Sequence, residues 1–281
     1  MKSLVIDKIN ILAITLTCII AGPAGAQMAQ SQRVFNFKKG DEFYRQTATK
    51  SSCIIQMGKS QVHINSNSLV ARAYDVSDVN DNGYIFTVTT KKISSTLDVD
   101  DKHLQFDSGA PLDNNSLLAK GLDYMIDKPT AVSIDKSGVI ANVEPPSVRL
   151  ANDTLLAFTG IANEQYVVGN KFGLISDFLL QGQLDKNFTW GDTTINGDIT
   201  TVNKFWVQSQ TATSTTIGFS SNSKGKIANT NTNGVYVLNN ASGVITQRIL
   251  KSVSAGYIFY KHNVYGSTRR WAISESCYKI K

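Results

Sequence analysis

The hexapeptide Asp-Val-Asn-Asp-Asn-Gly places oxygen-bearing side chains at alternate positions: Asp78, Asn80 and Asn82. This spacing, with Gly83 at the sharp bend, matches the start of a calcium-binding loop, in which carboxylate and amide oxygens surround the ion. The twelfth position, however, is Thr89, where such a loop needs a bidentate carboxylate. A tight turn between two strands uses the same residue types, because Asn and Gly tolerate positive φ. We therefore predict a hairpin turn here and keep calcium as the weaker alternative.

The C-terminal stretch 251–281 combines basic and aromatic side chains. It holds six lysines and arginines against one carboxylate, Glu275, and so carries most of the net charge of +6. Cations beside aromatic rings can stack on sugars or bases, or contact an anionic lipid headgroup. Alternation along strands would instead bury the aromatic rings and leave the charges in water. The candidate residues for docking on an anionic envelope surface are Lys261, Arg269, Arg270 and Trp271.

No arrangement of residues in the sequence predicts catalysis or a cofactor. The three histidines, His63, His103 and His262, lack the spacing of zinc ligands. The Gly-x-Ser-x-Gly, His-Glu-x-x-His and phosphate-loop patterns do not occur. Outside the basic C-terminal stretch the charge is balanced, which argues against a nucleic-acid binder. We expect a protein without cofactor that is not an enzyme. A hydrolase remains an alternative, because a triad is defined by geometry and not by sequence order.

The first 26 residues read as an export signal. Lys2 and Lys8 provide a basic start, an apolar run follows from residue 9 to residue 22, and Ala24-Gly25-Ala26 is a small-x-small cleavage site. A membrane anchor is the alternative, but it needs roughly 20 apolar residues. Cleavage near Ala26 predicts an extracytoplasmic protein, either periplasmic or secreted.

Cysteine usage fits that compartment. Cys18 lies inside the apolar run and follows Thr17 instead of a small residue, so we expect cleavage without lipidation. Cys53 and Cys277 remain after cleavage. In an oxidising compartment they could form a disulfide that closes a long loop, and two separate buried thiols are the alternative.

The elements that would position these residues are mostly strands. Short alternating runs with turn residues between them extend from Val34 to Thr90, as in an antiparallel meander. Helical spacing appears after Pro111 and again from about residue 147 to residue 182, and strands return after Asp185. The apolar residues of the helical stretches form core or, if a curved sheet encloses them incompletely, a ligand cavity. The candidate ligand-binding residues are Leu118, Leu122, Met125, Phe158, Phe172, Ile175, Phe178 and Leu179.

Two short patterns recur in the same order. Trp190-Gly191-Asp192 echoes Lys39-Gly40-Asp41, and Ser-Gly-Val-Ile occurs at 137–140 and 242–245. We interpret this as a degenerate duplication. The expected units are the signal peptide 1–26, a β-rich half with one helix 27–146, a helical connection 147–183 and a second β-rich half 184–281. The predicted fold class is α+β: two related antiparallel sheets, arranged as a curved half-barrel or separately, with helices packed on one face.

Four motifs together resemble a family of exported Bacteroidota proteins that is known as a domain of unknown function. They are Lys-Lys-Gly-Asp at 38–41, the stretch from Asp75 to Val88, Leu-Leu-Ala-Lys-Gly-Leu at 117–122 and Asp-Lys-Ser-Gly-Val-Ile at 135–140. The resemblance implies an envelope location and a β-rich fold, and it implies no activity. A looser likeness is to periplasmic lipid and lipoprotein carriers, in which a curved sheet encloses an apolar cavity.

These observations favour a non-enzymatic binding or carrier protein of the cell envelope, with an apolar ligand such as a lipid between sheet and helices. The second hypothesis is an interaction protein that docks through its basic, aromatic C-terminal strands. The third is a hydrolase with an unrecognised site. The sequence leaves the oligomeric state open.

Overall fold

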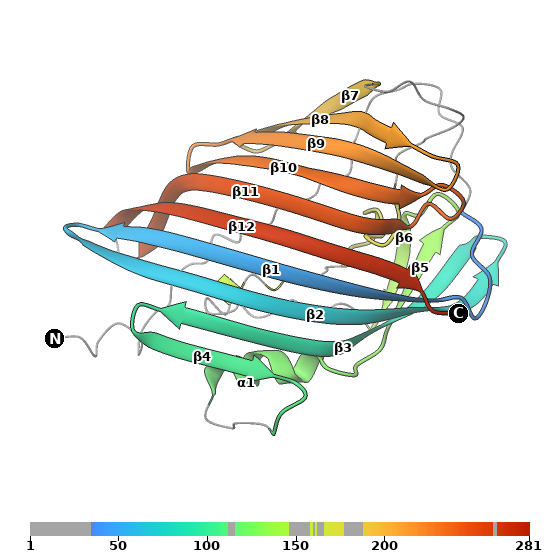
Figure 1. The fold of residues 1–281 in the computed structure, drawn as a ribbon, viewed down its shortest axis with the longest axis horizontal. Helices are drawn as coiled ribbons and strands as arrows, with labels where there is room; N and C mark the ends of the chain where they lie inside the picture. The colour runs from blue at the N-terminus through green and yellow to red at the C-terminus, as the bar shows by residue number, and fades with distance from the viewer. Residues whose placement is uncertain are drawn as a thin grey trace.

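One antiparallel sheet of twelve strands makes up most of the described chain (Figure 1). The computed structural model describes residues 35–111, 116–145, 158–159, 161, 166–176, 188–260 and 263–281. The order across the sheet is β6-β5-β3-β2-β1-β12-β11-β10-β9-β8-β7, and β4 pairs with the far end of β3. Along the chain the strands are β1 (Glu42–Met57), β2 (Ser60–Asn80), β3 (Gly83–Val99), β4 (Lys102–Asp107), β5 (Thr130–Asp135), β6 (Ile140–Glu144), β7 (Thr189–Asn196), β8 (Ile199–Gln210), β9 (Ser214–Lys224), β10 (Ala228–Asn239), β11 (Ile245–Tyr260) and β12 (Asn263–Lys279).

The predicted α+β class, with two sheets and helices packed on one face, is wrong. The two β-rich halves form a single sheet because β1 pairs with β12 over fourteen residue pairs, from Phe43↔Lys279 to Gln56↔Gly266. An unpaired β1 or β12 would expose a long row of backbone donors and acceptors, and pairing the two strands satisfies both rows. Sequence patterns within each half cannot reveal this pairing, since the partners lie more than 200 residues apart.

Side chains alternate between the two faces of the sheet along β1, whereas β2 has a register shift at Ala71/Arg72 and an unbroken buried run, Val70–Tyr74. In β1, residues from Phe43 to Ile55 are buried at every odd position, while the even positions between them are exposed or half-buried. We call the face with the buried side chains the inner face and the opposite face the outer face. The three clusters of buried apolar residues are centred on Phe86, Ile93 and Phe219.

The predicted helix after Pro111 is present. It comprises α1 (Leu117–Leu122), which Ser116 caps by accepting a hydrogen bond from the backbone N–H of Ala119, and the 3₁₀ turn η1 (Asp123–Met125). In the predicted helical connection, the stretch Tyr166–Ser176 instead runs through turns and isolated β-bridges. We call Tyr166–Ser176 the strap.

The strap connects the two Ser-Gly-Val-Ile turns. At one end the N–H of Phe172 donates to the carbonyl of Gly138, 3.0 Å away. At the other end the N–H of Ser176 donates to the carbonyl of Gly243, also at 3.0 Å. Four residues span at most about 14 Å, yet five to six strand spacings of about 4.8 Å separate the two turns along the sheet. The sheet must therefore curl around its inner face.

Candidate functional site

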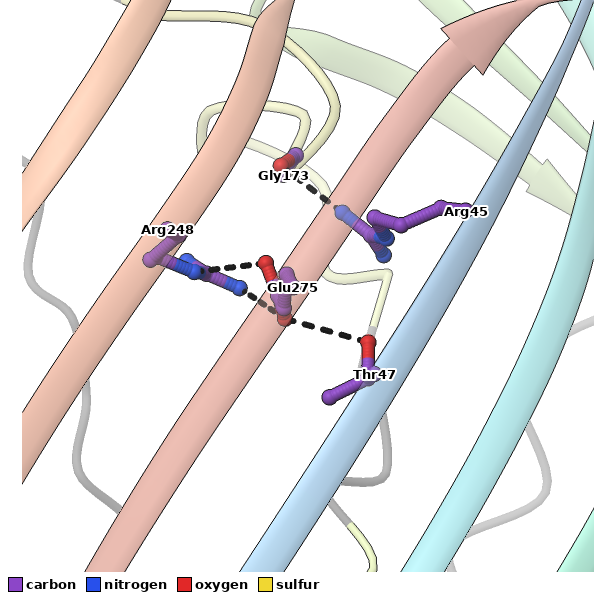
Figure 2. Close-up of polar contacts among 5 residues, drawn as sticks. All are labelled: Arg45, Thr47, Gly173, Arg248 and Glu275. Carbon is purple, nitrogen blue, oxygen red and sulfur yellow. Dashed lines mark hydrogen bonds and ion pairs between the residues drawn. The ribbon is translucent and has the colours of Figure 1, made fainter.

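Ionisable groups gather on the inner face, beneath the strap (Figure 2). Glu275 on β12 accepts two hydrogen bonds from the Arg248 guanidinium of β11, at 2.7 and 2.5 Å. Thr47 on β1 donates to the same carboxylate at 3.2 Å. Arg45, two residues before Thr47, donates to the carbonyl of Gly173 in the strap at 3.0 Å. The cluster thus ties three strands and the strap together.

The electrostatics of this cluster are those of a structural anchor. Burial by itself would raise the pKa of Glu275, but the charges of Arg248 and Arg45 and the hydrogen bonds from Arg248 and Thr47 outweigh it and lower the pKa to about 2. The carboxylate is therefore charged at any physiological pH and is a poor proton donor or acceptor. Its hydrogen bonds join β12 to β1 and β11, and Arg45 links this cluster to the strap.

The residues predicted to line an apolar cavity are core residues. Leu118 and Leu122 are fully buried, and Met125 and Phe158 pack against the same cluster. Phe172 and Ile175 belong to the cluster under the strap. Phe178 and Leu179 lie outside the described residues. Four of the six placed residues are buried in these clusters, and Met125 and Phe158 are half-buried.

The calcium alternative and the disulfide are not supported by the geometry. Asn80 Oδ1 accepts the N–H groups of Asn82 and Gly83, as in a hairpin turn, and Asp78 pairs with Lys39 at 3.2 Å. No metal-binding group of His, Cys, Asp or Glu occurs among the residues that the structure describes.

Cys53 and Cys277 are both buried and are not bridged. On the β1–β12 ladder Cys53 pairs with Arg269 and Cys277 pairs with Arg45. The two cysteines are thus eight residues apart along the ladder, or about 26 Å. A disulfide between them would require the ladder to break.

Strand alternation divides the predicted docking residues between the faces. Arg269 lies on the inner face, where its Nε donates to Ser51 Oγ at 3.3 Å, and Trp271 packs against the inner apolar cluster around Phe219. Arg270 points to the outer face and is exposed. Lys261 lies outside the described residues.

The outer face of the second half of the sheet is basic. From residue 188 to residue 281 the chain has three acidic residues, Asp192, Asp198 and Glu275. Asp192 and Glu275 occupy inner positions, opposite Asn203 and Arg248. The register of strands β1 and β7–β12 gives these described strands one outward carboxylate, Glu42, and five outward cations: Lys50, Lys204, Lys224, Lys251 and Arg270.

A groove of about 750 Å³ opens on this basic face, near the turns at Gly58 and Gly225. Arg270 and Lys226 line it, and no carboxylate does. The Asp198 carboxylate lies nearby and accepts the backbone N–H of Lys226 at 3.2 Å. Among the described residues neither cationic side chain takes part in an ion pair. The groove therefore presents two exposed positive charges.

Small residues between large ones create the groove. On the outer face Gly266 stands between Gln56 of β1 and Tyr257 of β11. A Cβ at Gly266 would have no neighbour closer than 4.0 Å, so its missing side chain leaves space open. The Tyr257 side chain is 55% exposed beside this gap. Amide and hydroxyl groups of Gln56, Gln61 and other lining residues complete a polar wall with one aromatic surface.

A second hollow, of about 500 Å³, lies between the sheet and the start of α1. Its lining mixes hydroxyl groups such as those of Ser68, Ser95 and Ser116 with apolar groups such as Phe106 and Ala119. Ser68 Oγ donates to the carbonyl of Thr159 at 2.6 Å and lies 2.9 Å from Ser95 Oγ. Lys50 and Asp107 also line the hollow, which is therefore amphipathic.

Comparison with known proteins gives structural matches of low similarity. No protein-family model and no curated protein matches the chain. A lipovitellin structure, described for its lipid–protein interactions, matches with 9% identity, a TM-score of 0.49 and coverage of 86% of this chain and 25% of lipovitellin. The outer membrane protein OpdK of Pseudomonas aeruginosa matches with 7% identity, a TM-score of 0.22 and coverage of 85% and 99%. The translocator domain of the Neisseria meningitidis autotransporter NalP matches with 9% identity and a TM-score of 0.23, and the match covers 88% of this chain and 92% of that domain.

This chain spans about a quarter of the lipovitellin chain that it matches. No helix in the described ranges is long and apolar enough to cross a membrane. With TM-scores below 0.5, function has to be inferred from the chain's own side chains.

The outer groove could be found only in part from the sequence. Arg270 was among the predicted docking residues, and its position next to Trp271 in an aromatic, basic stretch was the signal. Lys226, Tyr257 and Gln56 come from three different strands or turns, and only the register brings them together. Gly266, which leaves the space open, has no distinguishing feature in the sequence.

Proposed function

We propose that this chain is a non-enzymatic binding protein of the cell envelope, and that its outer groove binds an anionic, hydroxyl-rich ligand. The observation that carries the proposal is the pair of exposed cations, Arg270 and Lys226, in a groove without a lining carboxylate. Guanidinium and ammonium groups form charge-assisted hydrogen bonds with carboxylate or phosphate. The Tyr257 ring offers a flat apolar surface. The Gln56 amide donates to the carbonyl of Gly58 and accepts from Gln61 Nε2, so the side-chain oxygen of Gln61 is the amide group that can accept from a ligand hydroxyl. The envelope location rests on the export signal.

Binding of a short galacturonate oligosaccharide, followed by calorimetry, tests the proposal. A neutral dextran oligosaccharide is the reference ligand. Gly266→Phe should abolish binding because the new ring fills the groove, and the open space around Gly266 lets the variant fold. Lys251→Gln is the matched control, since Lys251 is an exposed outer-face cation of β11 that does not line the groove. Equal binding of both sugars, or equal loss in both variants, would contradict the proposal.

A second candidate function is the carriage of an amphipathic ligand between the sheet and α1. The mixed hollow beside Phe106 and Ala119 favours it. Its lining replaces the residues predicted from sequence, which are core. A ligand there needs an apolar portion against Phe106 and hydroxyl groups toward Ser95 and Ser116. Native mass spectrometry of the exported protein should then detect an added mass, and Ala119→Phe should remove it.

A further inference from the structure

The β11–β12 hairpin projects beyond both of its neighbours in the sheet. The last pair between β10 and β11 is Ala228↔Gly256, and the last pair between β1 and β12 is Gln56↔Gly266. The pairing of β11 with β12 continues outward to Tyr260↔Asn263. Tyr257 still donates its N–H to the carbonyl of Ile227 at 3.0 Å, so the part that extends past both neighbours is Ile258–Tyr260 with Asn263–Tyr265, directly beyond the outer groove. We call this part, together with Tyr257 at its base, the projecting tip.

The two faces of the projecting tip are unlike each other. Ile258 and Tyr265 point inward and pack against the cluster around Ile93, which fixes the hairpin to the body of the protein. On the outer side Tyr257, Phe259 and Val264 are 55%, 42% and 56% exposed. Phe259 and Val264 are direct partners in the ladder, so they form one apolar surface. Exposed apolar groups grouped in this way mark an interaction site.

A soluble ligand in the groove does not account for this surface. Neither Phe259 nor Val264 lines the groove, so a saccharide bound beside Arg270 would leave both side chains in water. A partner that covers them must extend past the groove and over the tip. It must also tolerate the positive charge of Arg270 and Lys226. The described strands β7–β12 have no outward carboxylate, and Asp198, in the turn between β7 and β8, is an acid that lies near Lys226.

From these observations we infer that the projecting tip and the groove cations beside it, Arg270 and Lys226, dock on an anionic lipid bilayer. Phe259 and Val264 enter the headgroup–acyl boundary, where apolar side chains gain by leaving water. Tyr257 lies at the level of the headgroups, as amphipathic rings do at membrane interfaces. Arg270 and Lys226 contact lipid phosphates, because basic groups are attracted to an anionic leaflet.

This inference rests on the proposed function, because the anion in the groove is then a lipid phosphate. Charge complementarity is the argument for a bilayer. The tip supplies apolar insertion and the face behind it supplies cations, which are the two signals that a peripheral protein combines. An acidic protein partner would need carboxylates facing the same cations, and it is an outcome that the experiment excludes or reveals.

Co-flotation with vesicles tests the inference. The exported chain is mixed with vesicles of phosphatidylglycerol and phosphatidylethanolamine, or of phosphatidylcholine alone. We expect binding to the anionic vesicles that weakens with added salt. Phe259→Ser should lower the affinity about tenfold, the effect of removing one buried aromatic side chain from the bilayer.

Ile249→Ser is the matched control. Ile249 lies on the same outer face of β11, is 48% exposed and sits ten residues from Phe259. Its substitution should leave flotation unchanged. Equal effects of the two variants, or equal flotation with both kinds of vesicle, would overturn the inference.

The galacturonate assay separates this inference from the proposed function. Phe259→Ser should bind the oligosaccharide as the unchanged protein does, because Phe259 does not line the groove. Oligosaccharide binding without flotation overturns the bilayer and keeps the groove. Loss of both in the unchanged protein overturns both. If Gly266→Phe floats with anionic vesicles as well as the unchanged protein does, the tip docks without the groove. This result also contradicts the inference.

Discussion

The inner and outer faces of the same strands use polar residues in opposite ways. On β12, Glu275 points inward and its carboxylate is bound by Arg248 and Thr47, whereas Arg270 points outward and forms no ion pair with the described residues. Pairing is obligatory on the inner face, because a buried charge without a partner costs several kcal/mol. On the outer face water solvates the charge, so the cation can remain available for a ligand. The difference separates residues that hold the fold from residues that can bind.

Removing the inner carboxylate should have the largest effect. Glu275→Gln leaves Arg248 and Arg45 buried near a neutral amide, and breaking a buried pair costs about 3–5 kcal/mol. Urea unfolding at pH 7 measures the change. Arg270→Gln is the outer control and should alter the free energy of unfolding by less than about 0.5 kcal/mol. Equal effects of the two substitutions would remove the distinction between the faces.

Acid should weaken the fold through the same carboxylate. The folded pKa of about 2 lies below the ordinary value of 4.5, so Glu275 stabilises the fold above pH 4.5 and this contribution is lost as pH falls toward 2. At 1.36 kcal/mol per unit, the loss is about 3 kcal/mol. Stability curves from pH 7 to pH 2 for the unchanged protein and Glu275→Gln should converge at low pH. The difference between them isolates Glu275, because Asp41 and Asp135, whose pKa values are also lowered, titrate in both proteins. If the two stability curves stay parallel down to pH 2, the acid-dependent loss of stability does not come from Glu275.

Alanine substitutions at two glycines with positive φ test how tightly the strap region is packed relative to an outer turn. Gly138 has φ +83° and a Cβ there would lie 2.2 Å from Ile175 Cδ1 in the strap, whereas Gly58 has φ +64° and open space. Alanine at either position costs about 1–2 kcal/mol from the left-handed backbone. Gly138→Ala should cost a further 1–3 kcal/mol or so from overpacking. Thermal unfolding of both variants measures the difference, and equal melting temperatures would show that the strap is not held tightly against the turn.

On the outer face, removing a cation should weaken ligand binding without changing the free energy of unfolding. Arg270→Gln should lower the affinity of the groove for the galacturonate oligosaccharide about tenfold, as expected for the loss of one charge-assisted contact. Its free energy of unfolding should stay within about 0.5 kcal/mol of the unchanged protein. Calorimetry and urea unfolding on the same sample test the two halves of this expectation. An unchanged affinity would place the ligand elsewhere.

The two recurrent sequence motifs differ in whether both copies form the same local structure. Both Ser-Gly-Val-Ile stretches form turns with a positive-φ glycine, Gly138 and Gly243. The sequence predicted these turns because a turn-forming residue precedes the tetrapeptide in each copy. The Gly-Asp pairs diverged: Gly40 lies in a turn, whereas Gly191 lies within β7. Local residue types predict turns well where a positive φ is required, and poorly where a strand can absorb the glycine.

The sequence alone indicated strand-rich halves, a helix after Pro111 and the two Ser-Gly-Val-Ile turns, because these follow from alternation, spacing and turn residues along short stretches. It also determined that the C-terminal strands are basic and aromatic. Only the tertiary structure decided that β1 joins β12, that the strap pulls the two turns together and that Arg270 meets Lys226 and Tyr257 across a gap left by Gly266. The physical reason is the distance along the chain over which each interaction acts. Alternation acts between neighbours in sequence, whereas ladder register and the place of a missing side chain depend on backbone pairing between residues far apart in the chain.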